Sequence, residues 1–156
     1  MATKKWVLLV DAGLTKHAAM MGKVVDWQAL KRLLAGRGPI VLPILFAPAG
    51  LTHIFTAARR QGFFIVAAPE ARYDADKLED SVDIDLIRLG EALGLISDPD
   101  IGFMVVSNDR HMTNLVASLQ FLGKEVMIVG TEDIAGAMKE VAGVDSVLAL
   151  PLSDRE

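Results

Sequence analysis

Short apolar runs alternate along this chain with longer segments in which apolar residues recur at helical spacing. The runs are bounded by glycine, proline or aspartate, and their lengths predict buried strands at residues 6–10, 40–46, 63–67, 101–107, 125–129 and 146–150. The other segments predict helices at residues 27–35, 52–61, 82–95 and 110–122, and a short helix that starts at Thr131. Strands that alternate with helices form right-handed βαβ units. We therefore predict an α/β fold with a mainly parallel sheet and helices on both of its faces.

Turn and capping residues refine this prediction. Residues 11–22 and 69–81 lack a clear period and are expected to be irregular loops. Asp26 precedes the helix at residues 27–35 and is expected to cap its N-terminus. Pro43 cannot donate a hydrogen bond to a neighbouring strand, so its strand is expected at an edge of the sheet or with a bulge.

Length and composition fit one folded domain. The chain has 156 residues, of which 52% are hydrophobic, which allows a sizeable core. No internal repeat or linker divides the sequence, so we expect a single domain over residues 1–152 and a frayed tail over residues 153–156. The high apolar fraction also favours a homodimer. No apolar run reaches the roughly 18 residues of a membrane span.

Charge and cysteine content narrow the classes of function. The sequence has no cysteine, which excludes disulfides and thiolate metal sites, and we expect a cytoplasmic protein. The formal net charge is −4, so the overall charge does not favour binding to nucleic acid. A polyanion would have to meet a local basic patch or a bound metal ion.

Three aspartates stand at junctions between predicted strands and helices. Asp11 and Asp109 each follow a predicted strand, and Asp83 opens an amphipathic helix. Because the carboxyl ends of parallel strands form one edge of a sheet, two of these carboxylates should meet there, and the third can reach the same rim. Carboxylates bind Mg²⁺ or Mn²⁺, which can activate a water and stabilise an in-line displacement at phosphorus. The pattern therefore favours a divalent metal site and phosphate chemistry.

Each aspartate also has a structural explanation. Asp11 can accept hydrogen bonds from backbone amides in its turn, and Asp109 can cap a helix that starts at Arg110. Asp83 can favour the positive end of its helix. Position alone does not decide between these roles and a metal site.

Other polar residues near the predicted edge are further candidates. Ser107 and Asn108 can orient a water or a phosphate, although turn formation explains them as well. His111 can bind a metal ion or transfer a proton, whereas a histidine in a first helical turn is more often structural or solvated. His17 lies in a predicted loop of the same region. Basic residues that could form a rim for phosphates, and that also fit a solvated helix surface, are Lys16, Lys23, Arg59, Arg60 and Arg110.

Four segments, taken together, have the order and spacing of a known family. Residues 10–14 fit an apolar strand with an acidic turn, and residues 25–30 fit a helix start. Residues 81–86 fit a helix of the form VDV-x-L, and residues 105–112 with 122–126 fit a segment of the form SGDSDF…LGKKV. In these segments the chain resembles NYN domains, the PIN-like group that includes the LabA-like bacterial proteins.

The resemblance implies a three-layer α/β/α fold of PIN-like, Rossmann-like type and a ribonuclease site in which acidic residues bind Mg²⁺ or Mn²⁺. By matching position, the catalytic and metal-binding residues are Asp11, Asp83 and Asp109. The chain departs from the family pattern at three places. Residues 13–15 lack a usual Asn, Leu89 replaces an acidic residue, and His111 replaces another.

Two hypotheses of function follow from the resemblance. The first is a metal-dependent ribonuclease that acts on RNA phosphodiesters, and the second is a catalytically eroded domain that binds RNA or a protein partner. A third comes from another enzyme class, because residues 11–15 faintly resemble the D-x-D-x-T loop of haloacid-dehalogenase-like phosphatases. Gly13 occupies the position of the second acid of that loop. The turn G-x-G-x-x-G of dinucleotide-binding folds is missing.

Overall fold

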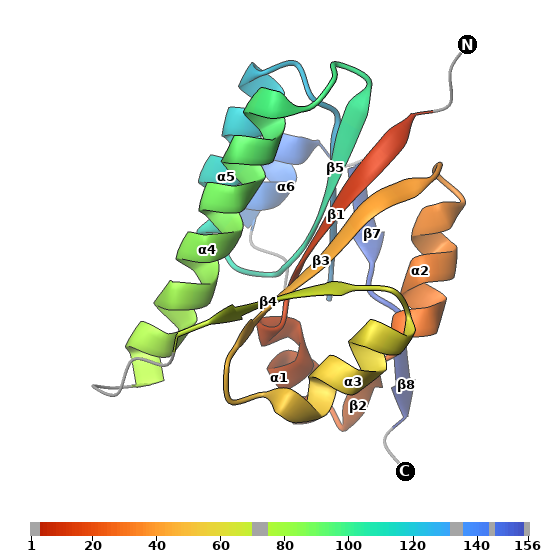
Figure 1. Cartoon of the computed structure of the whole chain (residues 1–156), viewed down its shortest axis with the longest axis vertical. Helices are drawn as coiled ribbons and strands as arrows, with labels where there is room; N and C mark the ends of the chain where they lie inside the picture. The colour runs from red at the N-terminus through yellow and green to blue at the C-terminus, as the bar shows by residue number, and fades with distance from the viewer. Residues whose placement is uncertain (1–3, 70–74, 132–135, 144–145, 155–156) are drawn as a thin grey trace.

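The described part of the molecule is built around a sheet of six strands. The computed structural model describes residues 4–69, 75–131, 136–143 and 146–154, with side chains for all of these except residues 16, 17, 75–81, 136 and 137. The strands are β1 (Lys5–Asp11), β3 (Ile40–Pro48), β4 (Phe64–Ala68), β5 (Ile101–Val106), β6 (Val126–Gly130) and β7 (Val147–Ala149), in the order β4-β3-β1-β5-β6-β7. All neighbours in this sheet are parallel, as predicted (Figure 1). A second, two-stranded sheet pairs β2 (Lys23–Val25) with β8 (Leu152–Asp154).

Helices cover both faces of the large sheet. One face carries α2 (Trp27–Ala35) and α3 (Thr52–Arg60), and the other carries α4 (Ala75–Ile96), α5 (Met112–Phe121) and α6 (Gly136–Ala142) (Figure 1). The helix α1 (Gly13–Met20) follows the carboxyl end of β1. The predicted three-layer α/β/α architecture is therefore confirmed. In the described part of the chain, no helix combines the length and the apolar character needed to cross a lipid bilayer.

The core lies in two halves, one on each face of the sheet. Leu8 of β1 belongs to the apolar cluster beneath α2 and α3, which includes Leu30. Its neighbour Leu9 belongs to the cluster beneath α4 and α5, which includes Leu86. Successive side chains of a strand point to opposite faces, so a strand that is buried on both faces must be apolar at every position. This is why the sequence of β1 is an unbroken apolar run.

Two segments predicted as irregular loops contain helices instead. Residues 11–22 contain all of α1, and α4 begins inside the segment 69–81, of which residues 70–74 lie outside the described structure. The start of α1 has no capping side chain and no acidic residue in its first turn, so the usual sequence signals of a helix start are missing. Burial of Leu14 and Ala18, four residues apart, instead fixes this helix against the core.

Pro43 lies in an interior strand, but no strand pairs with β3 on one side at this position. β3 has β1 on one side and β4 on the other, which contradicts an edge position for the whole strand. However, β4 pairs with β3 only from Ile44 onwards, so no residue of β4 faces Pro43. The pairing of β3 with β1 also shifts register between Trp6 and Val7. The missing N–H of the proline is thus tolerated because its strand is locally open on one side.

The predicted frayed tail is wrong for Ser153 and Asp154. Both residues belong to β8, which pairs antiparallel with β2. Asp154 forms an ion pair with Lys23, and the Ser153 hydroxyl donates a hydrogen bond to Asp26 Oδ2 at 3.2 Å. Asp26 also caps α2, as predicted, because its Oδ1 accepts a hydrogen bond from the helix at 2.9 Å. Contacts with a segment far away in the sequence therefore order this end of the chain, up to Asp154.

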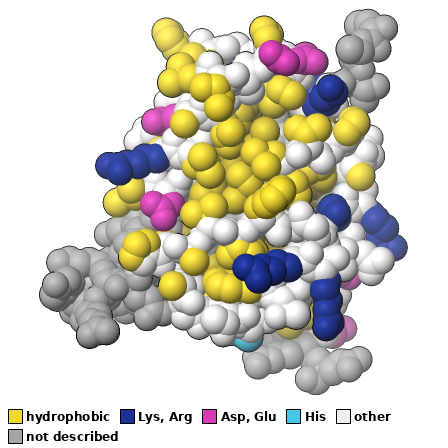
Figure 2. Space-filling view, viewed as in Figure 1, with side chains coloured by type: hydrophobic (Ala, Val, Ile, Leu, Met, Phe, Trp, Pro, Cys, Tyr) yellow, Lys and Arg dark blue, Asp and Glu magenta, His cyan; other side chains and the backbone are white. Residues whose placement is uncertain are grey.

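The open edge of the large sheet carries exposed apolar side chains. Figure 2 shows an apolar area in the middle of this face, where β3 and β4 lie in Figure 1. Phe64 of β4 is 61% exposed, and Val41 of β3 is 50% exposed. An edge strand presents unpaired backbone groups, so this face offers both hydrogen-bonding groups and apolar surface.

We predict that Gly102→Ala destabilises the protein by about 1–3 kcal/mol, the usual cost of overpacking a core. A Cβ atom at Gly102 would lie 2.5 Å from Cζ3 of Trp6. The indole ring is buried and its Nε1 donates a hydrogen bond to Arg37 O at 3.1 Å, so the ring has little room to move. Urea denaturation measures the free energy of unfolding. Gly36→Ala is the control, because its added Cβ would meet nothing nearer than 3.4 Å. Equal stability of the two variants would contradict the packing argument.

Candidate metal centre

Asp11 is the last residue of β1, and two hydrogen bonds fix its carboxylate. Its Oδ1 accepts from Gly13 N at 2.8 Å, and its Oδ2 accepts from the Ser107 hydroxyl at 2.9 Å. Ser107 directly follows β5, the strand that pairs with β1. The carboxyl ends of the two central strands are therefore joined through the side chain of Asp11.

The loop after β5 is also held by its own side chains. The fully buried Ser107 hydroxyl accepts a hydrogen bond from Asp109 N at 3.0 Å. Asn108 Oδ1 accepts from Thr131 N at 2.9 Å, and Asn108 Nδ2 donates to the Thr131 hydroxyl. Thr131 follows β6, so this pair joins the ends of β5 and β6. The sequence predicts Thr131 only as the start of a short helix, because nothing in its local sequence reveals a partner in another loop.

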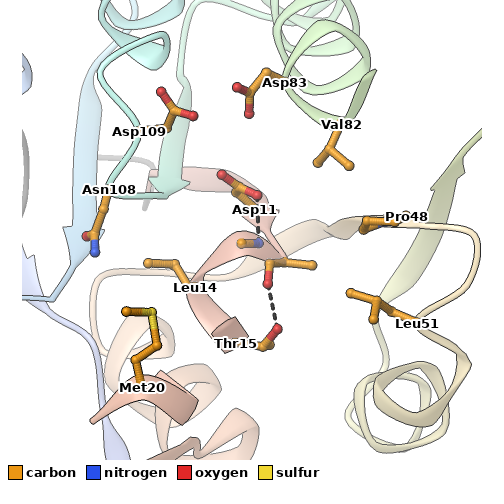
Figure 3. A pocket seen from close by; sticks show the side chains of 12 residues that line it. Asp11, Leu14, Thr15, Met20, Pro48, Leu51, Val82, Asp83, Asn108 and Asp109 are labelled. Atoms are coloured by element: carbon orange, nitrogen blue, oxygen red, sulfur yellow. Dashed lines mark hydrogen bonds between the residues drawn. The ribbon is translucent and has the colours of Figure 1, made fainter. Parts of the chain in front are cut away.

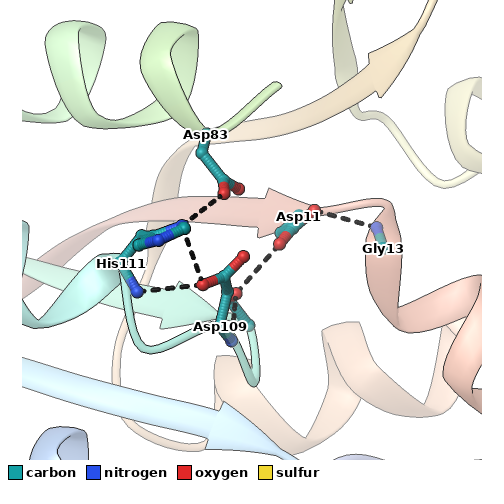
Figure 4. Close-up of polar contacts among 6 residues, drawn as sticks. Asp11, Gly13, Asp83, Asp109 and His111 are labelled. Atoms are coloured by element: carbon teal, nitrogen blue, oxygen red, sulfur yellow. Dashed lines mark hydrogen bonds and ion pairs between the residues drawn. The ribbon is translucent and has the colours of Figure 1, made fainter. Parts of the chain in front are cut away.

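Asp83 comes from a helix, α4, rather than from the end of a strand. It is only 6% exposed and lies well inside the helix, which begins at Ala75. The explanation that Asp83 favours a helix start is therefore wrong. Figure 4 shows its carboxylate pointing toward the loop after β5, where Asp109 and His111 lie.

Asp109, His111 and Asp83 form a compact group. His111 Nδ1 lies 3.2 Å from Asp83 Oδ2 and 3.2 Å from Asp109 Oδ1. The backbone N–H of His111 also donates to Asp109 Oδ1 at 2.9 Å. His111 itself is the N-cap of α5, which begins at Met112, so Asp109 is not the cap that the sequence suggested. Its carboxylate instead closes a tight turn with His111 and remains beside Asp83.

These residues stand at one end of a cleft of about 460 Å³. Asp11, Asp83 and Asp109 line it together, which agrees with the predicted meeting of the three carboxylates (Figure 3). The remaining wall is largely apolar and is formed by Ala12, Leu14, Met20, Pro48, Leu51 and Val82. No Lys or Arg with a described side chain lines the cleft. The cleft thus combines a negatively charged end with an apolar wall.

The sequence of this chain matches the model of the NYN domain family over residues 5–146. The chain belongs to the NYN domain family. Among curated proteins, none matches the sequence. The NYN domain has a PIN-like, nuclease-type fold, and the six-stranded parallel sheet with helices on both faces is of this type.

The donor atoms of this NYN domain fit a divalent metal ion, which NYN and PIN-like nucleases typically use. One atom each of Asp83, Asp109 and His111 lie within 4.8 Å of one another. Ligands of Mg²⁺ lie ~2.0–2.1 Å from the ion, so neighbouring ligands at right angles are ~3 Å apart. The two distances of 3.2 Å from His111 Nδ1 are close to that spacing. Asp11 lines the same cleft but is not part of this group of three.

The three residues that depart from the NYN pattern each have a defined contact in the structure. Leu89 of α4, at a position where the resemblance implies an acid, packs against the apolar cluster beneath α4 and α5. Gly13, where the resemblance implies a nearby Asn, supplies a backbone N–H to Asp11. His111 replaces an acid but stays in contact with the two remaining ones. In the described part of the chain, the acidic residues that line the cleft are therefore Asp11, Asp83 and Asp109.

The basic residues predicted to form a rim do not line the cleft where their side chains are described. Lys23 pairs with Asp154, and the exposed Arg59, Arg60 and Arg110 are not among the residues that line the cleft. The side chains of Lys16 and His17 lie outside the described residues. Sequence patterns reveal which residues are basic, but not the direction in which long, solvated side chains point.

Burial and the neighbouring carboxyl groups make the Asp83 side chain costly to ionise. Burial of Asp83, and next its hydrogen bond with Asp109, raise the pKa of Asp83 to about 7, although the contact with His111 opposes the rise. The contact with Asp83 and the charge of Asp109 raise the pKa of His111. A proton is therefore held in this group to a higher pH than in the unfolded chain.

We predict that the metal-free protein loses stability as the pH rises from about 4 to about 7. The stabilising contribution of Asp83 is complete below its unfolded pKa of 3.8 and is lost as the pH rises through about 7, and the raised pKa of His111 acts in the same direction. Asp83→Asn should therefore reduce the loss. Urea denaturation in a chelator at several pH values tests this, with Asp85→Asn on the same helix as control. An unchanged pH dependence in Asp83→Asn would contradict the assignment.

Proposed function

We propose that this NYN domain is a metal-dependent ribonuclease that cleaves RNA phosphodiesters at the cleft. The observation that supports this most directly is the meeting of Asp11, Asp83 and Asp109, which come from β1, α4 and the loop after β5, on one cleft. We assign to these three residues the catalytic and metal-binding role. Membership of the NYN family and its nuclease-type fold support the same reaction class.

Each residue has a distinct task in this proposal. A bound Mg²⁺ or Mn²⁺ would supply an activated water and offset the negative charge of the phosphate. Asp83 and Asp109 would hold the ion, and Asp11 is held in a fixed orientation at the end of β1. Ser107 and Asn108 are accessory residues that position the loop after β5, because the Ser107 side chain bonds to Asp11 and the Asn108 side chain bonds to Thr131.

The cleft fits a single RNA strand better than a duplex. The apolar wall next to the carboxylates, formed in part by Leu14, Met20 and Leu51, can contact an unpaired base while the adjoining phosphate faces the metal. In a duplex the bases are stacked inside and do not reach such a wall. Since no described Lys or Arg lines the cleft, the ion would be the main local positive charge for the phosphate.

We expect purified protein with Mn²⁺ to cleave single-stranded RNA, and Asp11→Asn and Asp109→Asn each to lower the rate by at least the ~10–100-fold that loss of even an indirect metal contact costs. Gel analysis of a labelled oligonucleotide measures the rate. Asp85→Asn is the matched control, because Asp85 does not line the cleft. Thermal melting checks that each variant is folded. If both variants kept the activity of the wild type, the cleavage would come from a contaminating nuclease, and the proposal would be overturned.

A second candidate function is an eroded domain that binds RNA or a protein without cleaving it. The observation in its favour is that His111 already contacts both Asp83 and Asp109, so these acids have a partner without any ion. In that case we expect no cleavage and no Mn²⁺ binding by calorimetry. RNA binding that persists in a chelator, measured by fluorescence anisotropy, would favour this candidate over the nuclease.

A homodimer stays a prediction. The described structure offers one suitable surface, the open edge of β4 with its exposed Phe64. Sedimentation of the wild type and of Phe64→Lys tests whether this edge pairs with a second copy, since a charge on an edge strand opposes such pairing.

A further inference from the structure

We propose that His111 is a ligand of the metal ion, and that its nitrogen makes the site selective for divalent transition-metal ions over Mg²⁺. This inference rests on the proposed metal site and names the residue that decides which ion it accepts. It concerns the place at which the chain departs from the acidic pattern of its family.

The first argument is the position of the ring nitrogen. His111 Nδ1 lies 3.2 Å from a carboxylate oxygen of Asp83 and 3.2 Å from one of Asp109. A metal bound between these carboxylates needs further ligands at ~2.0–2.2 Å, and neighbouring ligands then lie ~3 Å apart. The imidazole nitrogen therefore already has the spacing of a third ligand.

The second argument is that this position is built into the backbone. The N–H of His111 donates to Asp109 Oδ1, so a tight turn holds the histidine and the aspartate in a fixed relation. His111 is the N-cap of α5, whose next residue, Met112, is fully buried. The Ser107 hydroxyl anchors Asp109 N from the other side. The ring is thus presented to Asp83 by an anchored segment, although its own side chain is 54% exposed.

The third argument is the chemistry of the donor set. Mg²⁺ is a hard ion that prefers oxygen ligands, whereas imidazole nitrogen suits transition-metal ions. An acidic residue at position 111 would give an all-oxygen site. With His111 in its place, the group of Asp83, Asp109 and His111 becomes a mixed oxygen and nitrogen site. Such a site binds Mn²⁺ or a softer divalent ion in preference to Mg²⁺.

Pulsed electron paramagnetic resonance of the full chain with Mn²⁺ alone tests the inference directly. We expect nitrogen hyperfine coupling to the bound Mn²⁺ in the wild type. The control variant His53→Asp should show the same coupling, because His53 is exposed on α3 and does not line the cleft. The coupling should disappear in His111→Asp while Mn²⁺ stays bound. Bound Mn²⁺ without nitrogen coupling in the wild type, or coupling that survives in His111→Asp, would overturn the inference.

Competition between the two ions gives a second measurement. The concentration of Mg²⁺ needed to displace Mn²⁺ should fall by about tenfold or more in His111→Asp, a size typical for changes around a metal ligand, and should be unchanged in His53→Asp. An unchanged ratio in His111→Asp would contradict selectivity by His111.

These outcomes are separable from those of the ribonuclease test. Nitrogen coupling without RNA cleavage would support His111 as a metal ligand and overturn the proposed ribonuclease activity. RNA cleavage that depends on Asp11 and Asp109, without nitrogen coupling, would support the ribonuclease activity and overturn His111 as a ligand. Absence of Mn²⁺ binding to the wild type overturns both.

Discussion

The hydrogen bond from the Ser107 hydroxyl to Asp11 joins the carboxyl ends of the two central strands, and the arrangement of the cleft depends on it. β1 and β5 pair along their length, but pairing alone does not orient the residues that follow them. Ser107 bonds to Asp11 and also accepts from the backbone of Asp109, so one buried hydroxyl sets the position of two carboxylates. Buried hydroxyls bonded on both sides are rigid reference points, because breaking either bond leaves an unsatisfied polar group. Neutral donors, the Gly13 N–H and the Ser107 hydroxyl, therefore orient the Asp11 carboxylate at the acidic end of the cleft.

The third carboxylate obeys a different constraint. Asp83 is carried by α4, a helix whose apolar residues Val82 and Leu86 pack on the sheet. Its distance from the loop after β5 is therefore set by core packing (Figure 4). Repulsion among the acids is reduced by His111 and by the proton that Asp83 retains up to about pH 7. The core packing thus holds together groups that would separate in water.

The sequence predicts the sheet, its helical layers and the two carboxylates that follow strands, because these features depend on local apolar patterns. It does not predict α1, whose start lacks a cap, nor β2 and β8, whose partners lie more than a hundred residues apart. The position of Asp83 inside α4 and the contacts of His111 likewise depend on tertiary packing. By sequence alone, a histidine in a first helical turn such as His111 is more often structural or solvated, because a lone histidine gives no sign of the two acids that fold against it. Long-range contacts of this kind leave no periodic signal in the residues that make them.

The pairing of β2 with β8 has a consequence for how the protein can be labelled or joined to other molecules. The strand β8 ends at Asp154 and pairs with β2, and β2 in turn contacts α1, which contributes Leu14 and Met20 to the cleft wall. Lys5, at the start of β1, lies at the opposite end of the sheet (Figure 1). A dye or tether attached at Asp154 would therefore stand at the end of the molecule where α1 lies, whereas one attached at Lys5 would stand at the other end (Figure 1). The two positions thus offer separate attachment points at opposite ends of the sheet.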